Sequence, residues 1–501
     1  MDRWGDESSG AGKEKPLAPA WRDSPEAVPL VVDLDGTLVA TDILFESVLS
    51  LIRQSPASVL LFPIWLIRGK AAFKSEVEKR FKVDVRSLPY RPALLEYLRR
   101  ERATGRKLVL ATAAHEGTAC SAATHLDLFD EVLATTDSVN MKGTLKRDEL
   151  VARFGVRGFD YIGDSKADMP VWATCRIGHV AGQRSALPTA VLGTGTQQGE
   201  VFSERRPTLK TWMHAMRVQQ WVKNSLVVVP TLLNHQLNWE VLKALAITFL
   251  AFSFVASGTY IANDLFDLAA DRRHPRKCKR PLASGELSIV QGICLAACLL
   301  PAGILLGLMI GKALVVCLLI YVLLTLLYTS FLKGKPIIDV IALAILYTLR
   351  VYAGGLVTQA YVSPWLFQFS IFLFLSLAFV KRYSELRRSR EQRRLDVPGR
   401  SYRMPDLSII SQAGVSSGLL AGLVLALYVN EAGLERIYPR PHMLWGVCPL
   451  FVYWIIRTWL IAHRGNMTED PILFAFRDRV SYIVGFLIVV AVLLALTPNV
   501  D

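Results

Sequence analysis

The stretch Asn-Asp-Leu-Phe-Asp-Leu-Ala-Ala-Asp at residues 263–271 decides the fold of the carboxyl-terminal half of the chain. It follows an apolar segment directly, so its acidic residues stand at the end of a membrane helix, where ionisable side chains are functional candidates. On a helix, Asn263, Asp267 and Asp271 project toward one face, with Asp264 beside them. Their carboxylates repel one another unless a hard cation such as Mg²⁺ neutralises them. The alternative is a solvated acidic helix end beside the basic residues that follow.

Long apolar runs surround this stretch on both sides. A membrane-crossing helix needs about 20 mostly apolar residues. Nine such segments are predicted, at 222–237, 240–262, 288–310, 312–332, 337–359, 363–383, 408–430, 441–461 and 479–497. The first is the weakest, because its apolar run is short and contains Pro230.

The composition separates two halves. The 501 residues are 52% hydrophobic, but the excess lies in 240–500, whereas 1–205 read as an ordinary α/β protein. The formal charge of +14 comes from Lys and Arg in loops between apolar runs, which favours a membrane surface over nucleic acid as the partner. The seven cysteines show no C-x-x-C pair, so neither disulfides nor a zinc site is expected.

The basic loops predict the orientation in the membrane. With nine spans, the Lys- and Arg-rich loops 263–287, 333–336 and 384–405 fall on one face together with the amino-terminal domain. The positive-inside rule makes this face cytoplasmic. We therefore expect a multi-pass protein of the inner or plasma membrane, with the amino-terminal domain and the active-site loops in the cytoplasm.

Further polar residues gather at the ends of the predicted spans. Arg350 stands inside an apolar run, where a charge usually faces a cavity or a partner. The others are equally compatible with interfacial anchoring of the helices. The candidates for substrate binding are Gln220, Lys223, Asn224, Asn263, Arg272, Lys277, Arg280, Tyr328, Lys333, Asp339, Arg350, Lys381 and Arg382.

Residues 210–500 resemble the UbiA superfamily, whose Asn-Asp-x-x-Asp-x-x-x-Asp motif is similar to 263–271. That resemblance implies nine transmembrane helices around a cavity, with Mg²⁺ on Asp264, Asp267 and Asp271 holding a diphosphate. The chain departs from the aromatic prenyltransferases of the superfamily, because the loop YTSFLKGKPIID after the fourth span has one Asp where they carry a second acidic motif. It is closer to the decaprenyl-phosphate phosphoribosyltransferases, which have stretches similar to QWVKN, DRRHPRKCKRP, YTSFLK, RVYAGG and KRYSEL of this chain.

The resemblance implies phosphoribosyl pyrophosphate as donor and a polyprenyl phosphate as acceptor. Asp264 and Asp267 would act at the departing diphosphate, while Arg and Lys hold the 5-phosphate and the lipid phosphate. The acceptor is already an anion, so no strong general base is needed. Two alternatives remain open: a prenyl transfer from prenyl diphosphate to an aromatic or quinone acceptor, and a non-catalytic lipid-binding or scaffold protein.

The amino-terminal half contains a short apolar strand that ends in Asp33-Leu-Asp35-Gly-Thr. This resembles the first motif of the haloacid dehalogenase class, in which the first Asp is the nucleophile and the second the acid/base. The resemblance implies Thr112 as a phosphate-binding hydroxyl and Lys146 as the neutralising cation. It also implies an Mg²⁺ site, for which the candidates are Asp33, Asp35, Asp164 and Asp168. Residues 42–105 would form a small helical cap, whose apolar stretch 57–68 either docks on the membrane or packs in the core.

The sequence as a whole predicts a bifunctional membrane enzyme. A disordered tail is expected at 1–26, a haloacid dehalogenase-like α/β domain at 27–200 and an all-α UbiA-type membrane domain at 201–501. The amino-terminal domain at 27–200, called the head below, would remove the 5-phosphate of the lipid product, unless it is a structural or regulatory relic. The expected partners are the two substrates, Mg²⁺ and membrane lipids but no nucleic acid, and a homo-oligomer is left open.

Overall fold

The computed structural model describes residues 28–183, 185–203, 206–235, 238–358, 363–391, 401–431, 438–467 and 470–497. The chain divides into two compact units. Unit 1 combines Met1–Thr211 with the later segment Leu265–Ile289, and unit 2 combines Trp212–Asp264 with Val290–Asp501. The predicted tail at 1–26 lies outside the described residues.

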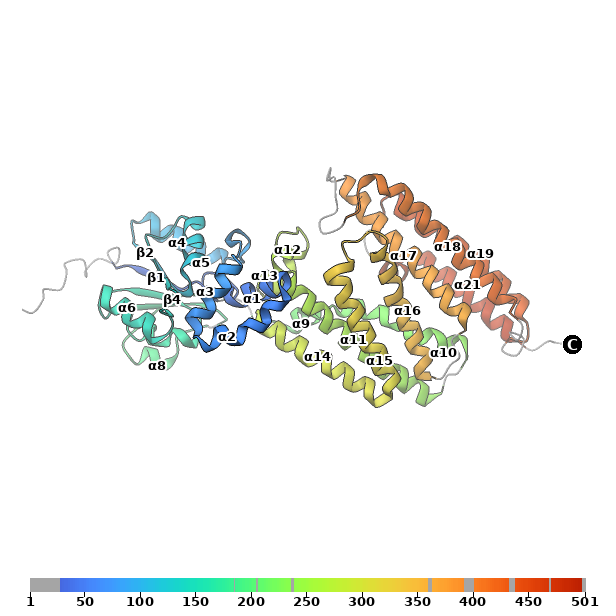
Figure 1. Ribbon diagram of the computed structural model, residues 1–501, viewed down its shortest axis with the longest axis horizontal. Helices are drawn as coiled ribbons and strands as arrows, with labels where there is room; N and C mark the ends of the chain where they lie inside the picture. The colour runs from blue at the N-terminus through green and yellow to red at the C-terminus, as the bar shows by residue number, and fades with distance from the viewer. Residues whose placement is uncertain are drawn as a thin grey trace, which may run out of the picture. The chain divides into compact units, whose positions relative to one another are not determined.

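Unit 1 is built on a six-stranded sheet (Figure 1). Its strands are β1 (Leu30–Val32), β2 (Leu108–His115), β3 (Glu131–Thr135), β4 (Asp160–Gly163), β5 (Ile177–Gly182) and β6 (Gln197–Ser203). They lie in the order β3-β2-β1-β4-β5-β6, and every pair is parallel. Because β1 is in the middle, the loops that leave β1, β2 and β4 emerge side by side at one edge, where ligands bind in open parallel sheets.

Helices cover both faces of the sheet and bury the continuous apolar runs of its central strands, as parallel sheets require. Val31, Val109 and Tyr161 pack on one side, while Leu30, Leu110 and Ile162 pack on the other. The covering helices are α4 (Pro92–Ala103), α5 (Glu116–Leu126), α6 (Thr144–Phe154), α7 (Met169–Trp172) and α8 (Thr189–Leu192).

The predicted cap is helical, and it lies between β1 and α4 in the chain. It consists of α1 (Ile43–Gln54), the 3₁₀ helix η3 (Pro56–Leu61), α2 (Phe62–Ile67) and α3 (Lys70–Arg80). A small separate core of Leu51, Trp65, Phe73 and Val77 holds these helices together. The cap is therefore a folded subdomain rather than an extended insertion.

The segment Leu265–Ile289 forms α12 (Leu268–Arg272), the 3₁₀ turn η7 (Lys277–Lys279) and α13 (Pro281–Ser284), and it packs within unit 1. A buried ion pair joins it to the cap, since Arg272 Nη1 donates to both carboxylate oxygens of Glu46 at 2.7 and 2.8 Å. Gly285 lies against Ala40, where an added Cβ would stand 2.8 Å from the Ala40 carbonyl oxygen. With φ at +85°, the position also favours glycine.

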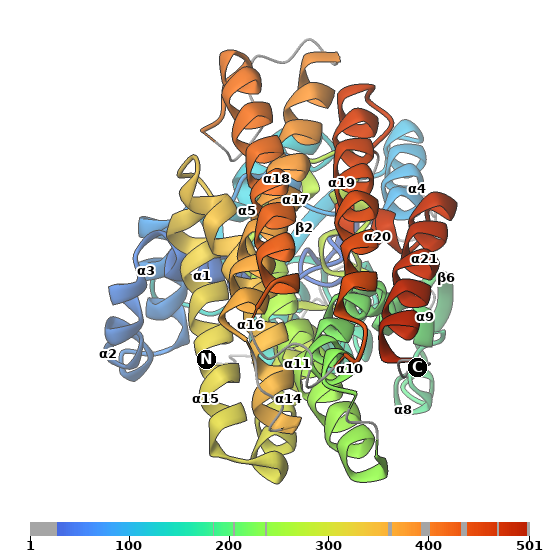
Figure 2. The same ribbon diagram turned by 90° about the vertical axis from the view of Figure 1, so that its right-hand side faces the viewer.

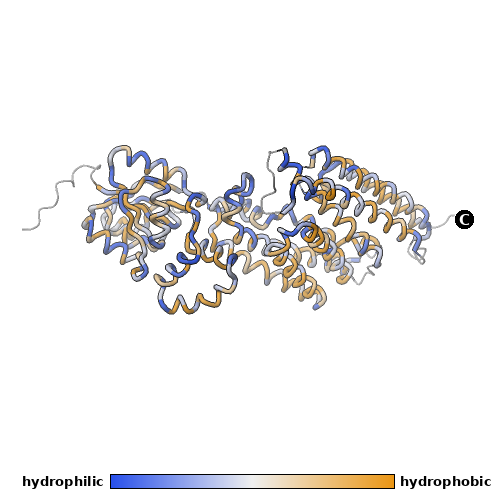
Figure 3. The backbone as a smooth tube through the Cα atoms, turned by 45° about the horizontal axis from the view of Figure 1, so that its top comes forward, coloured by the Kyte–Doolittle hydropathy of each residue, from blue (hydrophilic) through white to orange (hydrophobic). Residues whose placement is uncertain are grey.

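Unit 2 is helical, and eight helices of the chain's described part are long and apolar enough to cross a membrane. Figure 2 shows several of them running alongside one another, and they are orange in Figure 3. They are α11 (Trp239–Phe266), α14 (Ile289–Ile310), α15 (Lys312–Leu327), α16 (Ile338–Thr358), α17 (Pro364–Glu391), α18 (Leu407–Val429), α19 (Val447–His463) and α21 (Arg479–Leu496). The chain is thus a multi-pass membrane protein.

The first predicted span, 222–237, differs from the expectation. Its described residues form the 3₁₀ helix η6 (Val218–Val228) and the five-residue α10 (Val229–Leu233) instead of one long helix. Pro230 lacks an N–H and cannot continue the hydrogen bonds of η6, and it stands in the first turn of α10, where the missing N–H has no intrahelical partner to lose. The polar side chains of Lys223 and Asn224 are consequently buried against neighbouring helices rather than left at a helix end.

Candidate active sites

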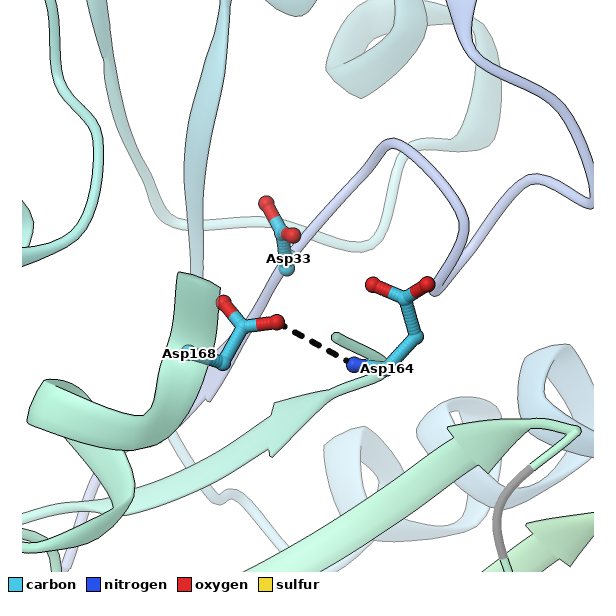
Figure 4. A group of neighbouring side chains, drawn as sticks. All are labelled: Asp33, Asp164 and Asp168. Carbon is cyan, nitrogen blue, oxygen red and sulfur yellow. Dashed lines mark hydrogen bonds between the residues drawn. The ribbon is translucent and has the colours of Figure 1, made fainter. Parts of the chain in front are cut away.

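The first candidate site lies at the carboxyl edge of the unit 1 sheet. Asp33 follows β1 directly, Asp164 follows β4, and Asp168 stands on the short 3₁₀ turn after it. One carboxylate oxygen from each lies within 4.8 Å of the others, and Figure 4 shows the three side chains around a common space. The Asp164 amide donates to Asp168 Oδ2 at 3.3 Å, which links the second and third of them.

Lys146 reaches this group from α6. Its Nζ lies 2.8 Å from Asp33 Oδ1 and 3.7 Å from Asp168 Oδ1. Tyr161 completes the contact, because its hydroxyl accepts from Lys146 at 3.1 Å and donates to Asp168 at 2.6 Å. Four of the residues predicted for one phosphate site are therefore brought together, with the cation beside the predicted nucleophile.

The three carboxyls carry more negative charge than the single lysine offsets. Burial raises the pKa of Asp33 to about 6, although Lys146 counteracts it. Burial and the neighbouring Asp168 raise the pKa of Asp164 to about 7. Burial and mutual repulsion thus disfavour the ionised forms of these carboxyls. A divalent cation bound between them would stabilise the ionised forms, so the group fits a metal site.

Asp35 has a different environment from the other acids. Its Oδ1 accepts from the Ile43 amide at 2.9 Å, and its side chain is not part of the three-carboxylate group. Burial, followed by repulsion from Asp42, raises the pKa of Asp35 to about 8. At neutral pH its carboxyl is therefore mostly protonated, which suits a general acid better than a metal-binding carboxylate.

The loop after β1 is shaped by Gly36 and Arg91, which are not among the predicted site residues, and the predicted Thr112 lies in the neighbouring strand β2. Gly36 has a φ of +73°, and a side chain there would collide with Asp164. Arg91 donates to the carbonyl oxygens of Gly36 and Thr37 at 2.7 and 2.8 Å and so fixes the loop. Thr112, fully buried in β2, accepts from the Ala114 amide at 3.0 Å. Sequence reasoning missed Arg91, and the only signal it gives is a basic residue before the proline that opens α4.

The second set of candidates is the acidic motif. Asp267 pairs with Arg53 of the cap at 2.6 Å, and Asp271 pairs with Lys277 at 3.5 Å and with Arg280. Arg272, predicted to bind substrate, instead pairs with Glu46. Asp267 and Asp271 thus each pair with a basic side chain. Among the described residues, Asp33, Asp164 and Asp168 are the one group in which three carboxylates lie close enough to share an ion.

In unit 2, Asp264 pairs with Arg217, whose guanidinium lies 4.9 Å from the centre of the Tyr260 ring. The neighbouring Asn263 Oδ1 is buried and has no hydrogen-bond partner among the residues that the structure describes. An unsatisfied buried acceptor is costly, so this oxygen fits a site that a cation or another ligand completes.

A buried polar cluster lies deeper among the helices. Arg350 on α16 is 3% exposed, and it donates to Asn224 Oδ1 at 2.8 Å and to the Tyr321 hydroxyl at 3.0 Å. Its guanidinium also lies 5.5 Å from the centre of the Tyr347 ring, as does Lys223 Nζ. Asn224 is held in turn by donating to Ser253 at 3.0 Å. The prediction groups Arg350, Lys223 and Asn224 as binding residues. The structure places Arg350 and Lys223 at one tyrosine ring, and Asn224 is hydrogen-bonded to Arg350.

Lys223 and Lys381 share one acidic partner that sequence reasoning missed. Asp470 accepts from Lys223 at 2.6 Å and from Lys381 at 3.4 Å. Burial alone would raise the pKa of Asp470, but the two lysines overcome it and lower the pKa below its usual range. The residue is one of a few acids in a polar loop, so its role could be found only from the fold.

Other predicted residues form a separate network. Arg382 donates to Asp339, to Glu385 and to the Tyr328 hydroxyl, and Tyr402 donates to Asp339 at 2.6 Å. Arg382 and Asp339 are at most 1% exposed, so they tie α16 and α17 together. Gln220 and Lys333 are partly exposed.

Comparison with known families accounts for this architecture. The model of the UbiA prenyltransferase family matches residues 227–480, half of the chain. The chain belongs to this family. A second model, that of haloacid dehalogenase-like hydrolases, matches residues 30–172, so the UbiA half carries a domain of that class at its amino terminus.

Three curated relatives are similar to the whole or to part of the chain. An uncharacterized protein, y4nM of Sinorhizobium fredii, is 34% identical over 474 residues, 94% of this chain and 91% of its own. The nodulation protein NoeC of Azorhizobium caulinodans is 35% identical over 274 residues, 54% of this chain and 89% of NoeC. Decaprenyl-phosphate phosphoribosyltransferase of Corynebacterium glutamicum is 33% identical over 177 residues, 34% of this chain and 53% of that enzyme.

Among solved structures, a UbiA homolog from Archaeoglobus fulgidus bound to GPP and Mg²⁺ is similar. It is 17% identical with a TM-score of 0.45, and the match covers 56% of this chain and 99% of that one.

Proposed function

We propose that the UbiA half transfers a 5-phosphoribosyl group from phosphoribosyl pyrophosphate to a polyprenyl phosphate. The observation that carries the proposal is the cationic cluster of Lys223, Lys381 and Arg350. Lys223 and Arg350 are buried and Lys381 is partly exposed, and Asp470 is the carboxylate partner of both lysines among the described residues. Buried cations beyond the reach of water are costly unless an anion joins them. Two phosphate-bearing substrates would supply that charge.

The bond changes are those of a displacement at the anomeric carbon. The bond from this carbon to the diphosphate oxygen breaks, and a bond to an oxygen of the lipid phosphate forms, so both electron pairs and the net charge balance. Asp264, Asp267 and Asp271 pair with arginines in this structure, so they would have to release these partners to hold Mg²⁺. The ion would then stabilise the departing diphosphate. Arg350 and the lysines would orient the phosphates by charge-assisted hydrogen bonds. The relative named decaprenyl-phosphate phosphoribosyltransferase supports this choice of substrates.

The head domain would then remove the 5-phosphate. An Asp33 oxygen would attack phosphorus, while Asp35, protonated near neutral pH, would give its proton to the departing ribose oxygen. Water would hydrolyse the aspartyl-phosphate, returning its proton to Asp35 and releasing phosphate. Lys146 beside Asp33 offsets the charge of the incoming phosphate. Tethering both activities in one chain would give the head a high local concentration of product.

The test uses purified protein in detergent with Mg²⁺, decaprenyl phosphate and ribose-labelled phosphoribosyl pyrophosphate, followed by extraction and mass spectrometry of the lipids. Label in the lipid supports the transfer, and loss of one phosphate supports the second step. Arg350→Met should abolish labelling. A matched control is Arg457→Met, because Arg457 forms a more exposed ion pair with Asp478.

The variant Asp33→Asn separates the two steps. It should still label the lipid but accumulate the product that retains its 5-phosphate. If it makes the same final lipid as the wild type, the head does not act on this product. If folded wild-type protein labels no lipid with several acceptor lengths, the transfer proposal fails, and prenyl diphosphates with aromatic acceptors become the next substrates. If the protein turns over neither of these two sets of substrates, a non-catalytic role is favoured.

A further inference from the structure

The cap of unit 1 presents an apolar surface that its own core does not use. It lies on η3 and α2, the stretch Pro56–Ile67, which is orange in Figure 3. Leu60 is 79% exposed and Ile67 is 86% exposed. The exposed apolar side chains of this surface are Val59, Leu60, Leu61, Ile64, Leu66 and Ile67.

The opposite face of the same stretch is firmly packed. Trp65 is 4% exposed and contacts the rings of Phe62 and Phe73, with centroids 5.5 and 6.3 Å apart. Arg80 stacks 4.4 Å from the centre of the Trp65 ring. The exposed residues therefore cannot turn inward without dismantling the cap core, and an apolar patch held outward in this way marks an interaction site.

A contact of the cap places this surface beside the end of a membrane span. Arg53 on α1 donates to the carbonyl oxygen of Phe266 at 2.9 Å and pairs with Asp267 at 2.6 Å. Phe266 is the last residue of α11, one of the eight candidate spans. The apolar stretch begins at Pro56, three residues after Arg53, which is a reach of about 10 Å.

The chain also enters and leaves this unit through membrane helices. The segment packed in unit 1 begins at the end of α11 and finishes at Ile289, where the next candidate span starts. A surface fixed close to the end of a span lies at the level of the lipid headgroups, where amphipathic helices insert their apolar faces. Arg68 and Lys70 follow the stretch, and basic residues there suit anionic headgroups.

We propose that η3 and α2 form a membrane-docking surface, which inserts Leu60, Ile64 and Ile67 into the headgroup–acyl boundary. The partner is thus the lipid bilayer that holds the spans of the same molecule. The surface keeps the cap at the membrane face independently of the reaction that either active site performs.

Single-cysteine labelling of the full chain in nanodiscs containing anionic lipid tests this proposal. All seven native cysteines are free thiols, so the five that are not buried can be replaced without breaking a disulfide, and Cys175 and Cys317 kept. An environment-sensitive fluorophore is attached at Leu60→Cys or Ile67→Cys. The matched control is Val156→Cys, an exposed apolar position between α6 and β4 in the same unit.

Probes on the docking surface should be quenched severalfold more by doxyl-labelled lipid, and severalfold less by aqueous iodide, than the probe at Val156. Equal iodide quenching at Ile67 and Val156, with no effect of doxyl lipid, would overturn the proposal. Shielding that appears only in discs holding two copies would also overturn it, because the surface would then bind a second chain. Loss of doxyl quenching in an Ile64→Glu variant labelled at Leu60 would support insertion.

Discussion

The Glu46–Arg272 pair should be the main tie between the cap and the acidic-motif segment, and Glu46→Ala tests this. Both side chains are almost completely buried, with exposed fractions of 3% and 5%. Arg272 also donates through Nε to the Ala283 carbonyl oxygen at 3.1 Å, so the same guanidinium holds α12 against α13. Removing the carboxylate leaves a buried positive charge without its counter-ion.

The expected cost follows from that burial. Removing one partner of a buried ion pair costs about 3–5 kcal/mol. Since about 1.4 kcal/mol is a factor of ten, local opening of the segment should become roughly 10² to 4 × 10³ times more frequent. The control is Asp84→Asn, because Asp84 pairs with the adjacent Arg273 on the surface, with exposed fractions of 41% and 62%. That change should cost less than about 1 kcal/mol.

Hydrogen exchange with mass spectrometry on the detergent-purified chain measures both variants. Peptides covering 268–284 should exchange much faster in Glu46→Ala than in Asp84→Asn, while peptides from β2 stay unchanged. The double variant Glu46→Met/Arg272→Met should recover most of the protection, since apolar residues can replace a buried pair. Equal exchange in the two single variants would refute the assignment of the tie to this pair.

Three further predictions follow from other residues. Lys146→Met should abolish phosphate release by the head while lipid labelling continues, because the buried cation beside the nucleophile is lost; the mass of the labelled lipid reports it. His179 is buried in β5, and burial lowers its pKa from 6.5 to about 4. The unfolded chain therefore takes up the proton first as the pH falls, so about 3 kcal/mol of head stability should disappear between about pH 6.5 and 4; His179→Asn should flatten this dependence in proteolysis assays. Gly354→Ala should lower the melting temperature in detergent, because its Cβ would strike the Val227 carbonyl, whereas Gly446→Ala, which meets open space, should not.

Periodic features of the fold could be predicted from the sequence. Eight of the nine predicted segments are long helices, because a run of about 20 apolar residues has few other stable forms in lipid. The strand before Asp33 could be predicted because a short apolar run ending in Asp-x-Asp-Gly-Thr combines a buried strand with a tight exit loop. The structure of 222–237 was harder to predict, since hydropathy shows neither the break between η6 and α10 nor the burial of polar residues there.

The partners of single charges could not be predicted. Arg272 and Arg280 belong to one basic run, yet the first pairs with Glu46 and the second with Asp271. The choice depends on which surfaces meet in three dimensions, and Glu46 precedes Arg272 by more than 200 residues. The same is true of Asp470, which forms ion pairs with two lysines from different helices.

The interrupted path of the chain through unit 1 has a consequence for dissecting the protein. A fragment that stops at Thr211 would carry the whole sheet and cap but not Leu265–Ile289. Glu46 would then lose its Arg272 partner, and Ala40 would lose the backbone packed against it. We therefore expect a soluble version of the amino-terminal domain to be more stable with residues 265–289 grafted back, joined by a linker in place of residues 212–264.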